Sequence, residues 1–137
     1  MIQNSFRSGC AVSSVLDLVG DKWSLLIIRD LLYYGKRTFK DFSQAGERIS
    51  SARLSDRLGK LENLEVLTKS VHPTNKKVYV YTLTPKGLDF APVLAEIISW
   101  AYKHLGSHIS GASKSLARQI KADRELTLSR FMKPYAN

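Results

Sequence analysis

Apolar residues three and four positions apart in the first part of the chain predict short amphipathic helices. One helix spans residues 10–19 and ends at Gly20, and a second spans residues 22–33, with Asp21 as its cap. Trp23 shares the apolar face of the second helix with its leucine and isoleucine neighbours. We therefore expect Trp23 to lie in the core rather than to stack on a ligand.

The next segment predicts two further helices. Thr38 caps a brief one, in which Phe39 and Phe42 face inward. Ser50 or Ser51 caps the following helix, whose leucines fall on one stripe and must be buried. That stripe consists of Leu54, Leu58, Leu61 and Leu64. On a helical wheel, the basic residues of this helix gather on one flank of the stripe: Arg53, Arg57 and Lys60.

The composition then changes to residues that favour β-structure. Residues 66–72 and 78–84 predict two strands, and the loop PTNKK between them forms the tip of a hairpin. Alternation along the second strand places three side chains on one face, which we expect to pack inward. They are Tyr79, Tyr81 and Leu83.

A long helix is predicted after the hairpin. It begins at Pro85, runs to about residue 104 and is kinked by Pro92. Residues 107–111 break the pattern, and residues 112–132 predict a last, highly charged helix. The fold class is therefore mainly α with a small β-hairpin (α+β). A short helix, an amphipathic helix and a basic hairpin in series are the parts of a winged helix-turn-helix with C-terminal dimerisation helices.

Net charge narrows the range of partners. Lysine and arginine outnumber aspartate and glutamate by 21 to 12 in a chain of 137 residues, which gives a net charge of +9 and a pI near 9.8. Such a protein attracts polyanions, and nucleic acid is the first candidate. The sequence has no run of about 20 apolar residues, and its N-terminus lacks the pattern of a secretory signal. A single cysteine favours a reducing, cytoplasmic location without a membrane partner.

Several strings together resemble one family. LVGDKWSLLIIRDL begins at Leu18, Cys10 precedes Trp23 with twelve residues between them, ISSARLSDRLGKLE follows, and YTLTPKG ends at Gly87. At these separations the strings resemble the HxlR-type bacterial transcription regulators over residues 9–105. The resemblance implies a homodimeric, cytoplasmic, sequence-specific DNA-binding protein without catalytic activity. Residues 106–137 lie outside it, and we expect this extension to contribute to dimerisation.

In this interpretation, the helix that begins near Ser51 enters the major groove of double-stranded DNA. Arg53 and Arg57 read base edges, Ser51 and Ser55 hydrogen-bond to bases or backbone, and Asp56 either accepts from cytosine or orients the arginines. The predicted phosphate contacts are Thr38, Lys40, Lys60, Asn75, Lys76 and Lys77. The alternative for these charges is a merely solvated surface, as in a winged-helix module that binds protein instead of DNA.

Dimerisation would cover the remaining apolar surface. The N-terminal helix, the helix over residues 85–105 and the C-terminal tail carry more apolar residues than a domain of this size can bury alone. Trp100 lies at the edge of one apolar arc, and core packing and contact with a second subunit are both open for it. Two recognition helices related by a two-fold axis would meet major grooves about 34 Å apart, which predicts a roughly palindromic operator.

Cys10 is the one residue with redox chemistry. The positive end of a helix stabilises a thiolate, and Arg7 lies nearby in sequence. Some members of the resembling family sense electrophiles or oxidants through a cysteine at this position. A sensor and a small buried thiol are both open at this point. A sensor could be alkylated, form a mixed disulfide, or bond to Cys10 of the other subunit.

No pattern indicates an enzyme. The three histidines have no ligand spacing with cysteine or a carboxylate cluster, so no metal is expected. The sequence contains no nucleophile elbow and no glycine-rich phosphate loop. We therefore expect no cofactor and no catalytic residue. The operator, the sign of regulation and the identity of any small-molecule effector are not readable from the sequence.

Overall fold

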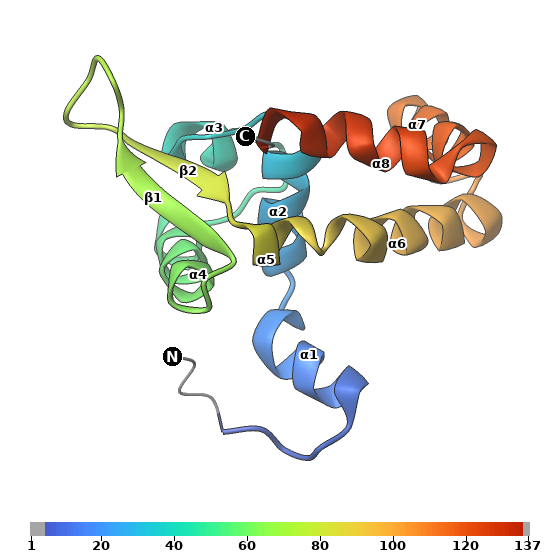
Figure 1. The fold of residues 1–137 in the computed structure, drawn as a ribbon, viewed down its shortest axis with the longest axis horizontal. Coiled ribbons are helices and arrows are strands. Elements are labelled where there is room, and N and C mark those ends of the chain that lie inside the picture. Colours follow the sequence, from blue (N-terminus) through green and yellow to red (C-terminus); the bar gives the residue numbers. More distant parts are fainter. Residues whose placement is uncertain (1–4, 136–137) are drawn as a thin grey trace. The chain divides into compact units, whose positions relative to one another are not determined.

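The computed structural model describes residues 5–135, and the chain divides into two compact units, Met1–Gly87 (unit 1) and Leu88–Asn137 (unit 2). The short helix α5 (Pro85–Leu88) lies at their boundary. Unit 1 contains α1 (Ala11–Val19), α2 (Ser24–Tyr33), α3 (Phe39–Ser43), α4 (Ser51–Asn63), β1 (Leu67–Val71) and β2 (Tyr79–Leu83) (Figure 1). Unit 2 contains α6 (Ala91–His104), α7 (Gly111–Ala122), α8 (Arg124–Met132) and the 3₁₀ helix η1 (Lys133–Tyr135). This mainly helical fold with one antiparallel hairpin confirms the predicted fold class.

Side-chain caps determine where the helices of unit 1 begin. Asp21 accepts hydrogen bonds from the backbone N–H groups of Trp23 (3.0 Å) and Ser24 (2.9 Å), so α2 begins two residues later than predicted. Thr38 and Asp41 form a capping box at α3, and the hydroxyl of Ser50 caps α4. Each cap satisfies backbone donors that a helix leaves unpaired in its first turn.

The leucine stripe of α4 is buried as predicted. Leu54 and Leu61 are fully buried, and Leu58 and Leu64 nearly so. They share the core of unit 1 with apolar residues of α2, α3 and the hairpin: Ile27, Ile28, Leu31, Phe42, Leu67, Tyr81 and Leu83. Burial of this one face leaves the opposite face of α4 to solvent.

The hairpin is attached to the rest of unit 1 by backbone and aromatic contacts. Its strands pair from Leu67 with Leu83 at one end to Val71 with Tyr79 at the other. The backbone N–H of Tyr81 donates to the carbonyl of Arg37 at 2.7 Å, between α2 and α3. The Tyr81 ring meets Phe42 edge-on, with centroids 6.0 Å apart. These contacts set the direction in which the hairpin leaves the core.

Three aromatic side chains differ from the prediction. Phe39 occupies the first position of α3 and is 36% exposed, and Tyr79 is 49% exposed. Tyr79 lies at the loop end of β2, beyond the core, where the ammonium group of Lys69 lies 4.4 Å from the centre of its ring. Trp23 is half-buried rather than part of the core, with Lys22 Nζ 5.0 Å from its ring centre. Periodicity shows on which face of a helix or strand a side chain lies, but it does not show how far the core extends along that face.

Two predicted long helices are each broken in two. Pro92 does not kink a continuous helix but lies in the first turn of α6, after a break at residues 89–90. Its ring would clash with the carbonyl four residues earlier, so the preceding helix ends first. The expected helix over residues 112–132 is broken at Asp123, which has extended backbone (φ −156°, ψ 95°) and accepts from Leu126 N–H at 3.0 Å as the cap of α8.

Within unit 2, the three helices pack on one another around a small apolar core. Its buried residues include Leu94, Ala95, Ala117, Ile120 and Leu128. The other side of α6 exposes Val93, Ile97 and Trp100, which share one helical stripe. Within residues 5–135, no helix has the length and apolar character that crossing a bilayer requires.

Candidate nucleic-acid interface

The face of α4 opposite the leucine stripe presents polar side chains to solvent. Ser51, Arg53, Ser55 and Asp56 are exposed. The hydroxyl of Ser50 accepts from the backbone N–H of Arg53 at 3.2 Å, which starts the helix so that these residues occupy its first two turns. All four were predicted site residues. The first turns of such a helix are those that contact base edges in helix-turn-helix proteins.

Arg57 is held differently from Arg53. Its guanidinium donates to Asp56 through Nε (3.0 Å) and Nη2 (2.5 Å), and its Nη1 lies 3.3 Å from Oδ1 of Asp21. The hydrogen bond to Asp56 is the largest cause of a raised pKa for Arg57. Asp56 therefore orients an arginine, which is one of the two roles predicted for it. Lys60, one turn further along α4, is half-buried.

Asp21 connects the start of α2 to α4. Burial alone would raise the pKa of Asp21, but hydrogen bonds from Ser24 and Trp23 and the charge of Arg57 outweigh burial and lower that pKa. Its carboxylate therefore stays charged beside Arg57. A hollow of about 720 Å³ lies here, lined by residues of both segments: Asp21, Lys22, Trp23, Ala52, Arg53, Asp56 and Arg57.

The tip of the hairpin is ordered by its own hydrogen bonds. Nδ1 of His72 accepts from the backbone N–H groups of Thr74 and Asn75, both at 3.2 Å. Oδ1 of Asn75 accepts from the N–H of Lys77 at 3.1 Å. The predicted site residue Asn75 thus shapes the loop. Lys76 and Lys77 are exposed, so the loop presents two cations in a defined turn.

A second hollow brings together predicted phosphate-binding residues that are distant in sequence. Its volume is about 860 Å³, and α3 and the hairpin line it. Thr38 is the cap of α3 and Lys40 lies in its first turn, whereas Asn75 and Lys77 come from the hairpin tip. Asp41 also lies in α3, but backbone hydrogen bonds from Arg37 and Thr38 lower its pKa and use its carboxylate inside the cap. The charge left free at this surface is therefore positive.

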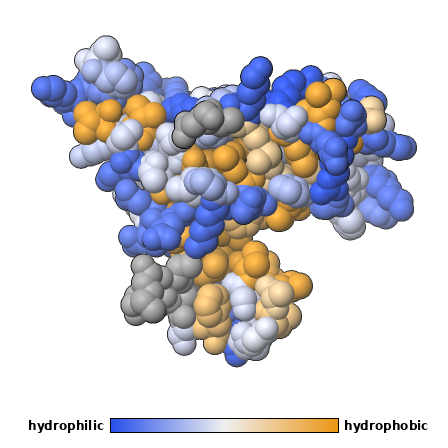
Figure 2. All heavy atoms as spheres, in the orientation of Figure 1, coloured by the Kyte–Doolittle hydropathy of each residue, from blue (hydrophilic) through white to orange (hydrophobic). Residues whose placement is uncertain are grey.

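Cys10 is exposed, so the alternative of a buried thiol does not hold. Its Sγ caps α1 by accepting from Ser13 N–H at 3.5 Å. Arg7, which the sequence places nearby, forms an ion pair with Asp17 instead (Nε to Oδ1, 2.6 Å). The apolar side of α1 is exposed at Val12, Val15 and Leu16, and Figure 2 shows hydrophobic side chains gathered on this helix.

Two features of the surface are not readable from the sequence. The contact of Arg57 with Asp21 joins residues 36 positions apart, and only the packing of α2 on α4 brings them together. Lys69 was not among the predicted contacts, yet it is exposed on β1 above Tyr79. Its place in a strand next to a lysine-tipped loop was the available signal.

Comparisons with known proteins agree with this geometry. The model of the HxlR-like helix-turn-helix family matches residues 18–109. YodB of Bacillus subtilis (strain 168), an HTH-type transcriptional regulator, is 34% identical over 90 residues, which cover 66% of this chain and 80% of YodB. YvaP of the same strain, an uncharacterized HTH-type transcriptional regulator, is 36% identical over 86 residues, covering 63% of this chain and 79% of YvaP.

Solved structures are similar as well. The reduced form of YodB aligns with a TM-score of 0.57 at 33% identity, over 71% of this chain and 95% of that one. The redox regulator HypR in its oxidized form aligns with a TM-score of 0.60 at 25% identity, over 69% and 97%. The family model matches most of the chain, and the helices and hairpin of unit 1 agree with it: this chain belongs to the HxlR-like helix-turn-helix family of DNA-binding transcriptional regulators.

Proposed function

We propose that the protein is a homodimeric regulator that binds a roughly palindromic operator, with α4 in the major groove and the hairpin against the adjacent backbone. The observation that carries this proposal is the exposure of Arg53 on α4 in the same unit as the exposed Lys76 and Lys77. A bacterial regulator of this kind would act in the cytoplasm, where its operator lies.

The two arginines of α4 would then have different roles. Arg53 is exposed and has the bidentate geometry that suits guanine O6 and N7. Arg57 is tied to Asp21 and Asp56, so it would give up an ion pair to reach a base. We assign Arg53 to base reading and Arg57 to holding α4 on α2. Thr38, Lys40, Lys60 and the hairpin lysines would neutralise phosphates and set the register.

A salt titration of operator binding tests this division. Lys76→Ala should weaken binding to all sequences alike and reduce the slope of log K against log salt by about 0.9. Arg53→Ala should cost about 1–3 kcal/mol, mainly on the cognate site. Lys133→Ala removes one charge from η1 of unit 2 and serves as the control. Equal losses on every sequence from the first two variants would contradict the assignment. A gel-shift assay against mixed genomic fragments tests the alternative. If the protein retards none of them, the result favours a protein-binding module.

Two exposed apolar stripes support the homodimer. One lies on α1 (Val12, Val15, Leu16) and the other on α6 (Val93, Ile97, Trp100). A second copy would cover both by burying like against like. Leu16→Glu and Ile97→Glu should each lower the dimer fraction in sedimentation equilibrium and weaken operator binding with it. Retained dimers in both variants would exclude these stripes from the interface.

We further propose that Cys10 makes operator binding sensitive to thiol-reactive compounds. The exposure of its Sγ supports this, as do the structures of YodB described as quinone-bound and diamide-treated. A Cys10 thiolate would add to a quinone ring carbon and form a C–S bond. One proton from solvent and the proton lost from that ring carbon would then protonate the two ring oxygens, which gives an S-substituted hydroquinone. With diamide, the thiols of two subunits would give a disulfide, and the N=N bond would take up two electrons and two protons.

The redox proposal is tested separately from DNA binding. Untreated Cys10→Ser should bind the operator as the native protein does, because serine can also cap α1. Quinone or diamide should change the operator affinity of the native protein only. Intact mass spectrometry identifies the adduct or the linked dimer. Unchanged affinity of native protein that is fully modified at Cys10 would exclude the sensor.

A further inference from the structure

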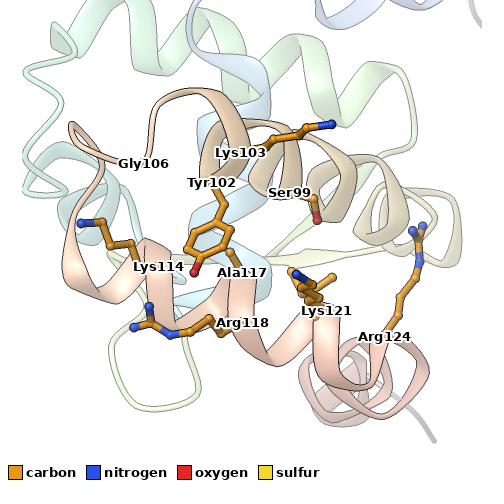
Figure 3. Close-up of a pocket in the computed structure, with 10 residues that line it drawn as sticks. Ser99, Tyr102, Lys103, Gly106, Lys114, Ala117, Arg118, Lys121 and Arg124 are labelled. Carbon is orange, nitrogen blue, oxygen red and sulfur yellow. The ribbon is translucent and has the colours of Figure 1, made fainter.

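A groove between α6 and α7 concentrates positive charge around an aromatic ring in unit 2. Its volume is about 1080 Å³, and the buried Ala117 and Ile120 contribute to its lining. Figure 3 shows Tyr102 extending from α6 toward α7, with Lys114 and Arg118 on one side of its ring and Lys121 and Arg124 on the other. The cations that line the groove are Lys103, Lys114, Arg118, Lys121 and Arg124.

These charges are poorly compensated within the protein. No carboxylate is among the described residues that line the groove. Arg124 pairs with Glu96 on α6, whereas the part of the chain that the structure describes gives no ion pair for Lys114, Arg118 or Lys121. These three follow one another at spacings of four and three on one face of α7, where like charges destabilise a helix. An anion in the groove would relieve that repulsion.

The shape and chemistry of the groove indicate a small ligand. The hollow is of the size that holds small molecules, and its lining mixes cations with apolar surface. Arginine and lysine bind phosphate and carboxylate oxygens through charge-assisted hydrogen bonds, and a half-buried tyrosine offers a ring for stacking. We propose that this groove binds a small organic anion with two or more phosphate or carboxylate groups beside an aromatic ring.

A duplex is a poorer occupant than a small anion. Double-stranded DNA is a convex rod whose phosphates meet side chains at its surface, and it would leave the tyrosine ring and the apolar part of the hollow unused. Four of the five cations also follow residue 109, where the match to the family model ends. All residues that line the groove belong to unit 2, and most of its cations lie in the C-terminal extension, whereas the proposed operator-binding residues belong to unit 1.

Fluorescence titration of the full-length protein with trinitrophenyl-ATP, an aromatic polyanion, tests the proposal. We expect saturable binding, weakened at least about tenfold in R118Q/K121Q because two charge-assisted contacts are lost. K76Q/K77Q removes the same charge from the hairpin tip and should keep the affinity within about twofold. Tyr102→Leu should weaken binding about threefold or more, whereas Tyr102→Phe keeps the ring and the affinity.

Three results would overturn the proposal of an anion site in this groove. Absence of saturable binding, or equal losses in the two double variants, would reduce the groove to a solvated surface. Displacement of the probe from K76Q/K77Q by a short duplex would make it a nucleic-acid site. If R118Q/K121Q does not fold, hydrogen exchange of the native protein decides: protection by the probe over residues 99–124 supports the site, and protection elsewhere contradicts it. Operator binding is measured separately and is proposed to depend on residues of unit 1, so failure of the groove proposal leaves the proposed regulator function standing.

Discussion

Arg57 of α4 and Asp21 before α2 form an ion pair, with Nη1 3.3 Å from Oδ1. Asp21 uses its other carboxylate oxygen to accept the N–H groups that begin α2. One carboxylate therefore caps one helix and holds the other. This arrangement couples the start of α2 to the position of α4, whereas Arg53 on the same helix is exposed.

Replacement of Asp21 tests that coupling through its pH dependence. Asparagine can still cap α2, so Asp21→Asn removes mainly the charge, and we expect about 0.5–1 kcal/mol less stability at pH 7. The folded protein holds the pKa of Asp21 below its ordinary value of 3.8. The contribution is therefore fully present above pH 3.8 and is lost as the pH falls through the lower folded value. Urea unfolding at pH 7, 5 and 3 measures it, and a difference independent of pH would assign the effect to the cap.

Replacement of Gly87 and of Gly59 by alanine should change the stability of the protein in opposite directions. A Cβ at Gly87 would lie 2.1 Å from the carbonyl oxygen of Val66, which Thr84 holds by two hydrogen bonds. Gly87→Ala should therefore cost about 3 kcal/mol or more. Gly59 lies within α4 with nothing within 4 Å of its Cβ position, so Gly59→Ala should add about 0.5–1 kcal/mol. Denaturant midpoints give both values, and a stable Gly87→Ala protein would contradict this packing.

The leucine stripe makes a quantitative prediction about stability. Leu54 is fully buried between α4 and the rest of the unit 1 core, so Leu54→Ala should cost about 2–5 kcal/mol through lost burial and a cavity. Leu126 of α8 is 62% exposed, and the same truncation there should change stability by less than about 0.5 kcal/mol. Thermal unfolding of the two variants makes the comparison. Similar losses of stability in Leu54→Ala and Leu126→Ala would mean that Leu126 is buried in solution, for example against a second subunit.

Substitutions of Asn75 at the hairpin tip distinguish the effect of loop order from the effect of loop charge. Asn75→Ala removes the acceptor for Lys77 N–H, so exchange of that amide should accelerate while global stability stays within about 0.5 kcal/mol. Asn75→Asp keeps an acceptor and should keep the protection. Its added negative charge should nonetheless weaken DNA binding. Hydrogen exchange and operator titration of both variants measure these effects. Unchanged exchange in Asn75→Ala would mean that the loop is ordered by His72 alone.

Much of the fold is determined by local chemistry and is therefore readable from the chain. Serine at 50 and threonine at 38 each satisfy backbone donors within three residues, so the starts of α3 and α4 follow from the sequence. The four leucines of α4 recur at helical spacing, and periodicity alone assigns them to one buried face. The same period places Ser51, Arg53, Ser55 and Asp56 outside, which is why their exposure could be predicted.

Tertiary structure decided everything that depends on distance across the fold. The sequence cannot say that Asp21 reaches Arg57, that the core stops before Phe39 and Tyr79, or that Lys40 and Lys77 line one hollow. In unit 2, helical spacing alone could not show that Tyr102 meets the cations of α7, because that meeting requires the break at residues 105–110 and the packing of α6 on α7. Periodicity and capping act over one helical turn, whereas burial and ion pairing depend on which turns the packed chain brings together.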